Sequence, residues 1–514
     1  MSGFWKYAAE SPDFVAIVDP DETEISAGDL LARSNQVVHA LRELGLGEGD
    51  TVAAMLPNGH LPMEIYLGAL QAGLYYVPIN YRLAPAEVAY ILDDAEAKAF
   101  IAHERFAATV ISAAESAGIP ADARLGHGID GWRDAAAIFD AQSTDAPADR
   151  QAGAAMHYTS GTTGSPKGVK RKLSGLQPDV SAELFTGFFG IFGIPHRDDN
   201  VHLCTSPNYH TAVTTFAGNA LASGHRVVFM DGWDPAEALD KIGRYRCTHT
   251  HMVPTQFSRM LALPDDVKDA ADVSTMRWAI HAAAPCPPEV KWAMLDWWGD
   301  CIWEYYAATE GGGSVAPPQE WREHPGTVGR AWPGAELMIT DDDGNVMPTG
   351  EPGTVWMRMG AATFEYKGDK AKTEKSRDAE GYFTVGDIGY LDEDEYLFLC
   401  DRKSDMIIAG GVNIYPAEIE NAISVHPKVA DVAVFGIPDP DMGEQIKAVV
   451  QPEPGVEAGD DLTADIMEFI RDRLAKFKWP RSIDYRDELP REPTGKLLKR
   501  KLRDPYWEGQ ARQI

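Results

Sequence analysis

The segment that most narrows the choice of fold is YTSGTTGSPKG, from Tyr158 to Gly168, which follows the apolar run from Ala154 to Met156. Its glycines let a ligand approach the backbone closely, its Ser and Thr side chains offer hydrogen-bond donors, and Lys167 adds a positive charge. This composition suits a polyphosphate ligand. An ordinary turn is the alternative, but five Ser or Thr hydroxyls, three glycines and a lysine within eleven residues argue against it.

The loop differs from a Walker A sequence, which requires G-x-x-x-x-G-K-[ST]. Here Pro166 precedes the lysine and Gly168 follows it. A P-loop kinase or GTPase is therefore disfavoured.

The loop resembles the phosphate-binding signature of the adenylate-forming superfamily, which includes acyl-CoA synthetases, amino-acid adenylation domains and firefly luciferase. Further segments resemble this superfamily in order and wide spacing over almost the whole chain: YYAATEGG (Tyr305 to Gly312), GTVGR (Gly326 to Arg330), GYFTVGDIGYLDEDEYLFLCDR (Gly381 to Arg402), GGVNIYPAEIE (Gly410 to Glu420) and PREPTGKLLKRKLR (Pro490 to Arg503). Within the superfamily the chain is most similar to fatty-acid or aryl acid CoA ligases.

Length and charge set limits that do not depend on this resemblance. A chain of 514 residues favours two or more domains, and its net charge of -31 disfavours non-specific binding to nucleic acid or anionic membranes. The five cysteines lack CxxC spacing, which argues against disulfides or a zinc site. Neither a signal peptide nor a run of roughly 18 apolar residues is present. We expect a cytoplasmic protein without integral membrane association that binds small molecules; a homodimer is left open.

The hydrophobic pattern predicts alternating helices and strands in the N-terminal part. Helices are expected around Leu30 to Leu44, Pro62 to Ala72 and Pro85 to Leu92, with TVAAML and YYVPI as strands of a parallel sheet. The strand candidates ELMIT, TVWMRM, YFTV and YLFLC then predict a mainly antiparallel portion, and VADVAVFGI, KAVVQP and the helical DIMEFIRDRLAKF a second domain.

The resemblance implies an α/β fold in two parts. A large N-terminal AMP-binding domain, residues 1–402, is expected to contain two α/β subdomains and a small distorted β-barrel. A smaller, mobile α+β domain, residues 403–514, would follow a hinge near residues 402–404. The family commonly has Asp or Lys two residues after the arginine, whereas this chain has Ser404.

The resemblance also implies where ATP binds. The β- and γ-phosphates are expected at the loop residues Thr159, Ser160, Gly161, Thr162, Thr163, Gly164 and Lys167. Tyr306 is expected to stack on adenine, Thr309 to bond the α-phosphate and Glu310 to bind Mg2+, a hard cation that prefers oxygen ligands. The remaining nucleotide contacts are expected from Ala283, Ala284, Tyr305 and Ala307 around adenine, and from Asp387 and Arg402 at the ribose. Ala307 and the run HAAAPCP stand where the family more often has glycine.

Three further sites follow from the resemblance. His210 in SPNYHTA matches a histidine beside the acyl and adenylate site, although a lone histidine is more often a core residue. Gly410 and Gly411 would let the pantetheine arm of CoA pass close to the backbone. Lys496 matches the adenylation lysine that bridges the carboxylate and the α-phosphate, while Lys499 to Arg503 are expected to form a solvated basic helix face.

The chemistry of acid activation explains why these residue types are needed. A carboxylate is a poor acyl donor, so it attacks the α-phosphate of ATP, releases pyrophosphate and gains AMP as a leaving group. Both reactants are anions, and catalysis depends on neutralising charge and on positioning. Amino-acid-activating relatives typically have an Asp after the aromatic position to bind the ammonium, whereas this chain has Thr211. A plain carboxylic acid is therefore preferred.

These observations predict an ATP-dependent acid:CoA ligase that uses ATP, CoA and Mg2+. Its substrate is expected to be an apolar acid: a medium- or long-chain fatty acid, an aryl acid, or an alicyclic or steroid side-chain acid. One alternative is a free-standing adenylation protein that loads a carrier-protein thiol. A second is a non-catalytic nucleotide-binding regulator, against which the presence of Lys167, Glu310, Asp387 and Lys496 argues.

Overall fold

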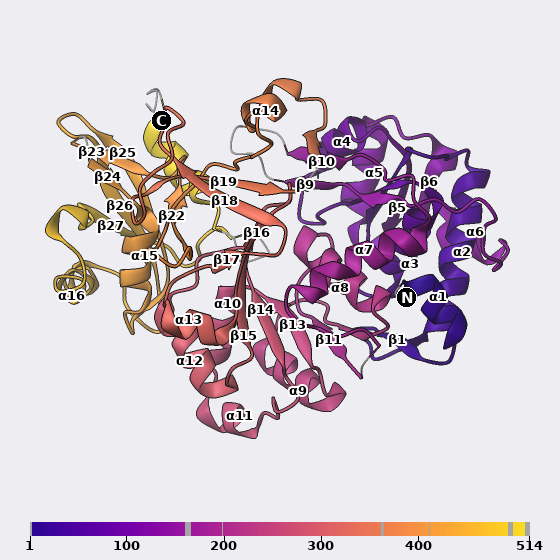
Figure 1. The fold of residues 1–514 in the computed structure, drawn as a ribbon, viewed down its shortest axis with the longest axis horizontal. Helices are drawn as coiled ribbons and strands as arrows, with labels where there is room; N and C mark the ends of the chain where they lie inside the picture. Colours follow the sequence, from indigo (N-terminus) through magenta and orange to yellow (C-terminus); the bar gives the residue numbers. More distant parts are fainter. Residues whose placement is uncertain are drawn as a thin grey trace.

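The structure, a computed structural model, describes residues 3–159, 166–197, 199–360, 364–410, 412–491 and 497–508, with the backbone alone for Thr159, Lys370 and Lys372. It is a mixed α/β protein with a large N-terminal part and a smaller C-terminal part (Figure 1).

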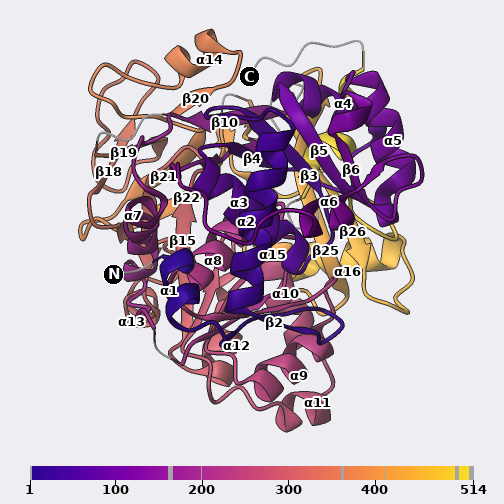
Figure 2. The ribbon, with the colours of Figure 1, turned by 90° about the vertical axis from the view of Figure 1, so that its right-hand side faces the viewer.

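The first sheet of the N-terminal part has parallel strands in the order β7-β6-β5-β3-β4-β8. Its strands are β3 (Thr51–Met55), β4 (Tyr75–Pro78), β5 (Ala97–His103), β6 (Arg124–His127), β7 (Arg133–Asp134) and β8 (Ala154–Ala155). The helices beside it are α2 (Ala27–Glu43), α3 (His60–Ala72), α4 (Pro85–Asp94), α5 (Ala107–Ser116) and α6 (Ala135–Asp140), several of which lie in front of the sheet in Figure 2.

Strand β3 shows why this sheet was readable from the sequence. Val52 and Ala54 pack into the core shared with α2 and α3, whereas Ala53 and Met55 pack against α4 and α5. A strand covered on both faces is apolar throughout, as in a parallel sheet. The predicted helices and strands of this region are thereby confirmed.

The second sheet has nine strands in the order β17-β16-β15-β14-β13-β11-β12-β1-β2. They are β1 (Val15–Val18), β2 (Glu24–Ser26), β11 (Val201–Cys204), β12 (Arg226–Phe229), β13 (His249–Met252), β14 (Trp278–His281), β15 (Ile302–Ala307), β16 (Gly313–Ala316) and β17 (Arg330–Ala331). The strands from β1 to β15 within this order are parallel, and the outer pairs are antiparallel.

Helices cover both faces of the nine-stranded sheet. They are α1 (Phe4–Glu10), α7 (Pro178–Gly190), α8 (Thr211–Ala222), α9 (Pro235–Tyr245), α10 (Pro254–Leu261), α11 (Asp265–Ala270), α12 (Pro288–Trp298) and α13 (Pro318–Glu323). Phe189 of α7 and Phe216 of α8 pack on one face, and Phe257 of α10 and Leu295 of α12 on the other. The sheet is thus a buried middle layer that fixes the loops at its ends.

Two antiparallel sheets follow. Where we expect a small distorted barrel, four strands run in the order β18-β19-β21-β22: β18 (Ala335–Thr340), β19 (Gly353–Met359), β21 (Asp387–Leu391) and β22 (Leu397–Arg402). A three-stranded sheet joins distant segments in the order β20-β10-β9: β9 (His157–Thr159), β10 (Lys167–Arg171) and β20 (Phe364–Tyr366), with α14 (Lys370–Lys375) after it.

The C-terminal part is an α+β unit with its own core. Its elements are β23 (Ile407–Ala409), β24 (Val412–Ile414), α15 (Pro416–Ser424), β25 (Val429–Asp439), β26 (Gly443–Pro452), α16 (Asp460–Phe469), β27 (Ser482–Tyr485) and α17 (Lys499–Arg503). The predicted boundary at residue 402 coincides with the end of β22, and it stays a prediction.

Two predicted elements are wrong in detail. Tyr382 to Val385 is not a strand, because only Phe383 pairs, in isolated bridges to Met357 and Arg377. The helix expected at DIMEFIRDRLAKF begins earlier, at Asp460, and ends at Phe469. Ile466 and Ile470 point into the domain core, so their spacing continued the helical pattern past the true end.

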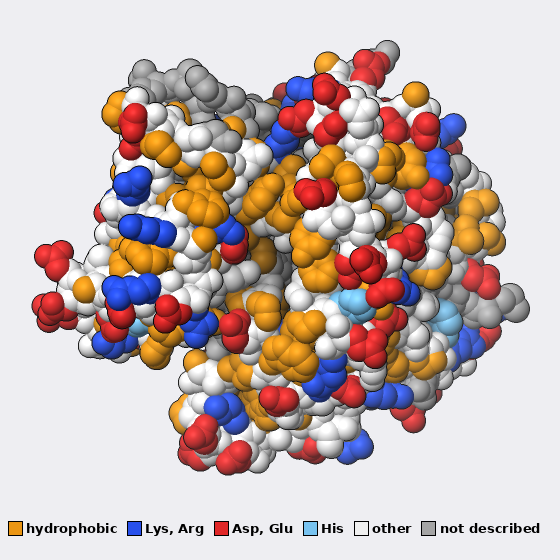
Figure 3. Space-filling model, turned by 60° about the vertical axis from the view of Figure 1, so that its left-hand side comes forward, with side chains coloured by type: hydrophobic (Ala, Val, Ile, Leu, Met, Phe, Trp, Pro, Cys, Tyr) orange, Lys and Arg blue, Asp and Glu red, His pale blue; other side chains and the backbone are white. Residues whose placement is uncertain are grey.

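The surface fits the acidic composition. Figure 3 shows acidic and basic side chains interspersed over the face in view, without a continuous basic patch. No helix in the described part of the chain is long and apolar enough to cross a membrane.

Candidate active site

The predicted residues gather at the carboxyl ends of the parallel strands of the nine-stranded sheet. The segment with His210 follows β11, Ala283 and Ala284 follow β14, and the loop with Thr309 and Glu310 follows β15. In open α/β sheets, ligands bind at this end of the strands. The topology therefore brings together segments that lie far apart in the sequence.

The loop with Thr309 and Glu310 is held from the small β9–β10–β20 sheet. The hydroxyl of Tyr366 donates to Oε1 of Glu310 at 2.7 Å, and the guanidinium of Arg171 donates to the carbonyl oxygen of Thr309. Burial, and then the Glu310 carboxylate, raises the pKa of Tyr366, so this hydroxyl keeps its proton and stays a donor. Tyr366 and Arg171 are contacts that the sequence motifs do not contain.

Most of the predicted phosphate loop, from Ser160 to Gly164, lies outside the described residues, and Thr159 is described by its backbone in β9. Lys167 begins β10 and lies 3.6 Å from a carboxylate oxygen of Asp369. The Tyr158 hydroxyl donates to Asp94 at 2.6 Å. The base of the loop is thus anchored on both strands.

Tyr306 and Asp387 meet, as expected for two residues of one nucleotide site. The Tyr306 hydroxyl donates to Oδ2 of Asp387 at 2.6 Å, and Nε of Arg402 lies 3.6 Å from Oδ1 of Asp387. Burial, and then the Asp387 charge, raises the pKa of Tyr306 well above its usual value, so the bond is a neutral donor to a carboxylate. Tyr305 points to the opposite face, where its hydroxyl lies 3.3 Å from Nε2 of His251.

The segment expected beside adenine has an unusual backbone. Ala283 has a φ of 73°, in the left-handed region that favours glycine. Ala283 is exposed, and Ala284 is half-buried. This backbone agrees with a position where the family more often has glycine, since the fold keeps the turn at a cost of about 1 kcal/mol for the methyl group.

His210 lies at the start of α8 beside aromatic rings. It is the N-cap residue, and its ring centroid is 4.3 Å from that of Tyr209, which packs edge-on against Tyr81 at 4.9 Å. The next residue, Thr211, accepts a long hydrogen bond of 3.5 Å from the Thr309 hydroxyl. The position expected to distinguish amino acids from plain acids therefore contacts the predicted α-phosphate residue.

Lys496 and Gly411 lie outside the described residues, but their neighbours are well held. Arg491 forms a bidentate pair with Asp431, with both N–O distances at 2.5 Å, and it bridges to Leu497 across the predicted lysine loop. Gly410 has a φ of 59°, and a Cβ there would meet the Met442 side chain at 2.4 Å. Glycine is thus required at this position.

The expectation of a solvated basic face on α17 is wrong for two of its residues. Lys499 is buried against Glu420 at 2.9 Å, and Arg503 donates to the Ser404 carbonyl at 3.2 Å and lies 3.3 Å from Asp405. Arg500 and Lys501 are exposed as expected. The local charge pattern did not reveal the acidic partners, which come from α15 and from the predicted hinge.

The Glu310 carboxylate fits the role of a Mg2+ ligand. Among the described residues it forms no ion pair, and only Oε1 is engaged by a hydrogen bond. An ionised carboxylate oxygen is the donor that Mg2+ prefers, and the cation would neutralise phosphate charge. The roles of the site residues stay predictions.

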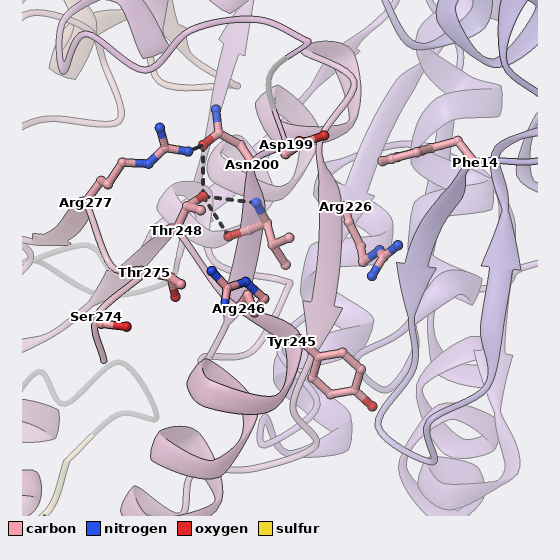
Figure 4. A pocket seen from close by; sticks show the side chains of 11 residues that line it. Phe14, Asp199, Asn200, Arg226, Tyr245, Arg246, Thr248, Ser274, Thr275 and Arg277 are labelled. Atoms are coloured by element: carbon pink, nitrogen blue, oxygen red, sulfur yellow. Dashed lines mark hydrogen bonds between the residues drawn. The ribbon is translucent and has the colours of Figure 1, made fainter. Parts of the chain in front are cut away.

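A separate pocket of about 580 Å³ lies at the amino ends of the same strands, away from these residues (Figure 4). It is lined by Arg226, Arg246 and Arg277, with Asn200 accepting hydrogen bonds from Arg277 and Thr248 at 2.6 and 3.0 Å. In this topology the helices end at the amino ends of the strands, where cations stabilise the helix dipole. These arginines are explained by the fold without a ligand.

Comparison with known proteins identifies the family. Residues 4–366 match the family described as "AMP-binding enzyme" and residues 418–496 the "AMP-binding enzyme C-terminal domain". The chain is 31% identical to a fatty acid–[acyl-carrier-protein] ligase, ScoC, of Streptomyces coeruleorubidus, covering 99% of this chain and 96% of the relative. It is 32% identical to a long-chain-fatty-acid–CoA ligase, FadD13, of Mycobacterium tuberculosis, covering 97% of each.

A solved structure agrees with this match. The anthranilate CoA ligase AuaEII, in complex with anthranoyl-AMP, superposes with a TM-score of 0.86 at 25% identity, covering 98% of this chain and 97% of that one. Matches over nearly full length in sequence and fold leave one assignment: the chain belongs to the adenylate-forming AMP-binding enzymes of the acyl-CoA synthetase family.

Proposed function

We propose that the protein is an ATP-dependent ligase that converts an apolar carboxylic acid to its acyl-adenylate and then to acyl-CoA, releasing AMP and pyrophosphate. The observation that carries this proposal is the assembly around β15: Thr309 and Glu310 lie on the loop that follows the strand, and Tyr306 within it bonds Asp387. The residues come from separate motifs and serve one nucleotide.

The surroundings of His210 and Thr211 support a plain, apolar acid. Thr211 brings no carboxylate to the Thr309 hydroxyl, so an ammonium group would lose water without gaining a charge partner, at a cost of several kcal/mol. Aromatic rings lie close by: Phe216 is 6.1 Å from Tyr305, and Phe188 is 6.2 Å from it. Fatty, aryl and alicyclic acids all suit such surroundings.

The first test is the identity of the nucleotide product. With a panel of fatty, aryl and steroid side-chain acids, the enzyme is expected to release pyrophosphate from ATP only when an acid is present, and to form AMP. The physical reason is that Thr309 and Glu310 are placed for attack at the α-phosphate, and the phosphate loop is not a Walker A loop. Nucleotide chromatography with ADP as the main product would rule the proposal out.

The acyl acceptor has a second candidate, because the similarity to ScoC includes a ligase that acts on an acyl carrier protein. Incubation of the enzyme with ATP, acid and CoA alone separates the two. Acyl-CoA formation at a rate close to that of adenylation supports CoA as the acceptor. Accumulation of enzyme-bound acyl-adenylate that only a carrier-protein thiol discharges would favour the carrier protein.

The predicted hinge offers a separate test of domain rotation. The Ser404 carbonyl accepts a hydrogen bond from Arg503, so α17 contacts the chain where the two parts join. Because proline fixes φ, Ser404→Pro is expected to impair thioester formation more than adenylation. The two half-reactions are measured separately, with circular dichroism to check folding. Equal loss in both steps would show that Ser404 is not the pivot.

A further inference from the structure

Arg171 stands out because its positive charge faces the predicted reaction centre although no predicted motif assigns it a role. It is the last residue of β10, the strand that follows the phosphate loop. Its guanidinium donates to the Thr309 carbonyl and lies close enough to Glu310 for their charges to interact. Both contacts are to the residues expected at the α-phosphate and at Mg2+.

The strand holds this arginine from two sides. Arg171 pairs with Phe364 in the antiparallel β10–β20 ladder, and its backbone carbonyl accepts a hydrogen bond of 2.8 Å from the Tyr75 hydroxyl. Successive side chains of a strand point to opposite faces, so Arg171 shares a face with Lys167, while Lys170 lies over the Tyr75 ring at 4.8 Å. The position of Arg171 is therefore set by the fold.

The charge of Arg171 is also more available than that of Lys167. Lys167 lies 3.6 Å from the Asp369 carboxylate, whereas Arg171 forms no ion pair with any residue that the structure describes. A guanidinium has five N–H donors, and one bond to Thr309 leaves several for a phosphate group.

Tyr366 completes the arrangement from the neighbouring strand. It pairs with Val169 in the β10–β20 ladder, and its hydroxyl holds one oxygen of Glu310 at 2.7 Å. A hydrogen bond to one oxygen fixes the rotation of the carboxylate and directs the other oxygen. Groups that orient metal ligands in this way strongly affect metal affinity.

We propose that the β10–β20 pair supplies the second half of the adenylation site, with Arg171 as a further phosphate-binding residue and Tyr366 as the positioning residue for Glu310. The inference rests on the proposed function, because it uses the roles of Thr309 and Glu310 in ATP activation. It adds two residues that act on the polyphosphate and its metal.

The test of Arg171 is direct binding of MgATP by calorimetry without any acid. Arg171→Ala is expected to weaken binding about tenfold to a hundredfold, the range for a charge-assisted hydrogen bond, and Arg171→Lys to restore part of it. Lys170→Ala, on the opposite face of the same strand, is the matched control and is expected to bind as the wild type does. Wild-type affinity in Arg171→Ala would overturn the assignment.

Tyr366→Phe tests the second residue by its dependence on metal. The Mg2+ concentration for half-maximal ATP binding is expected to rise about tenfold, with unchanged binding at saturating Mg2+. Melting temperatures check that each variant folds. An unchanged Mg2+ dependence would overturn the role of Tyr366. If the wild type itself failed to bind MgATP, the proposed function would fail as well, whereas binding that is insensitive to these variants refutes the inference alone.

Discussion

Lys496→Ala is expected to lose roughly two to three orders of magnitude in adenylation, while supplied acyl-AMP and CoA are converted to thioester near the wild-type rate. A lysine that bridges the carboxylate and the α-phosphate stabilises charge only while the anhydride forms. That loss is the typical effect of removing one preorganised charge stabiliser. The readouts are pyrophosphate release for the first step and acyl-CoA formation from acyl-AMP for the second.

The flanking structure makes Lys501→Ala the matched control. Lys501 is an exposed lysine on the same basic segment, and Lys499 is unsuitable because it is buried against Glu420. The Lys501 variant is expected to retain both half-reactions. If Lys496→Ala adenylated normally, or failed equally with preformed acyl-AMP, Lys496 would leave the catalytic set and the domain-rotation mechanism would lose its main support.

The parts of the fold and site that the sequence predicts are those encoded locally. The run from Thr51 to Met55 is apolar because both faces of β3 are covered, so its pattern alone indicates a buried strand. The hydrogen bond between Tyr306 and Asp387 joins two motifs whose roles were expected together. Local composition and resemblance are sufficient where each motif carries its own chemistry.

The contacts that the sequence misses depend on pairing between distant segments. Arg171 reaches Thr309 over a separation of 138 residues, and Tyr366 reaches Glu310 over 56. Nothing local to either residue signals these partners, since the β10–β20 ladder creates them. The same reason applies to Lys499, which looked like part of a solvated face until α15 placed Glu420 beside it.

Buried histidines lead to the second large prediction, a loss of stability in mild acid. Burial lowers the pKa of His157 and His202 to about 3 and of His127 and His251 to about 4, against an ordinary value of 6.5. Below pH 6.5 the unfolded chain therefore binds more protons than the folded one. Stability is complete above pH 6.5 and falls as the pH drops toward 4, at about 1.4 kcal/mol per pH unit for each histidine.

One buried carboxyl acts in the opposite direction. Burial raises the pKa of Glu64 to about 7, so its neutral form is favoured in the folded state and stability rises as the pH falls from 7 to 5. The four histidines together oppose folding by about 8 kcal/mol at pH 5, and Glu64 offsets about 3 kcal/mol of this. The remainder is about 5 kcal/mol, which is a large part of the stability of an ordinary domain.

Calorimetry at pH 7 and pH 5 measures this effect, with an expected fall in Tm of about 5 °C for a chain of this size. His202→Phe isolates one contribution, because His202 is 1% exposed and its ring stacks on Phe216 at 6.1 Å, so a phenyl ring suits the site and does not titrate. This variant is expected to lose about 2 kcal/mol less between the two pH values than the wild type. An identical pH dependence in both proteins would show that His202 is not held neutral by burial. A wild-type Tm that is the same at pH 5 and pH 7 would contradict the argument for the whole group, because the proton uptake on unfolding would then be absent.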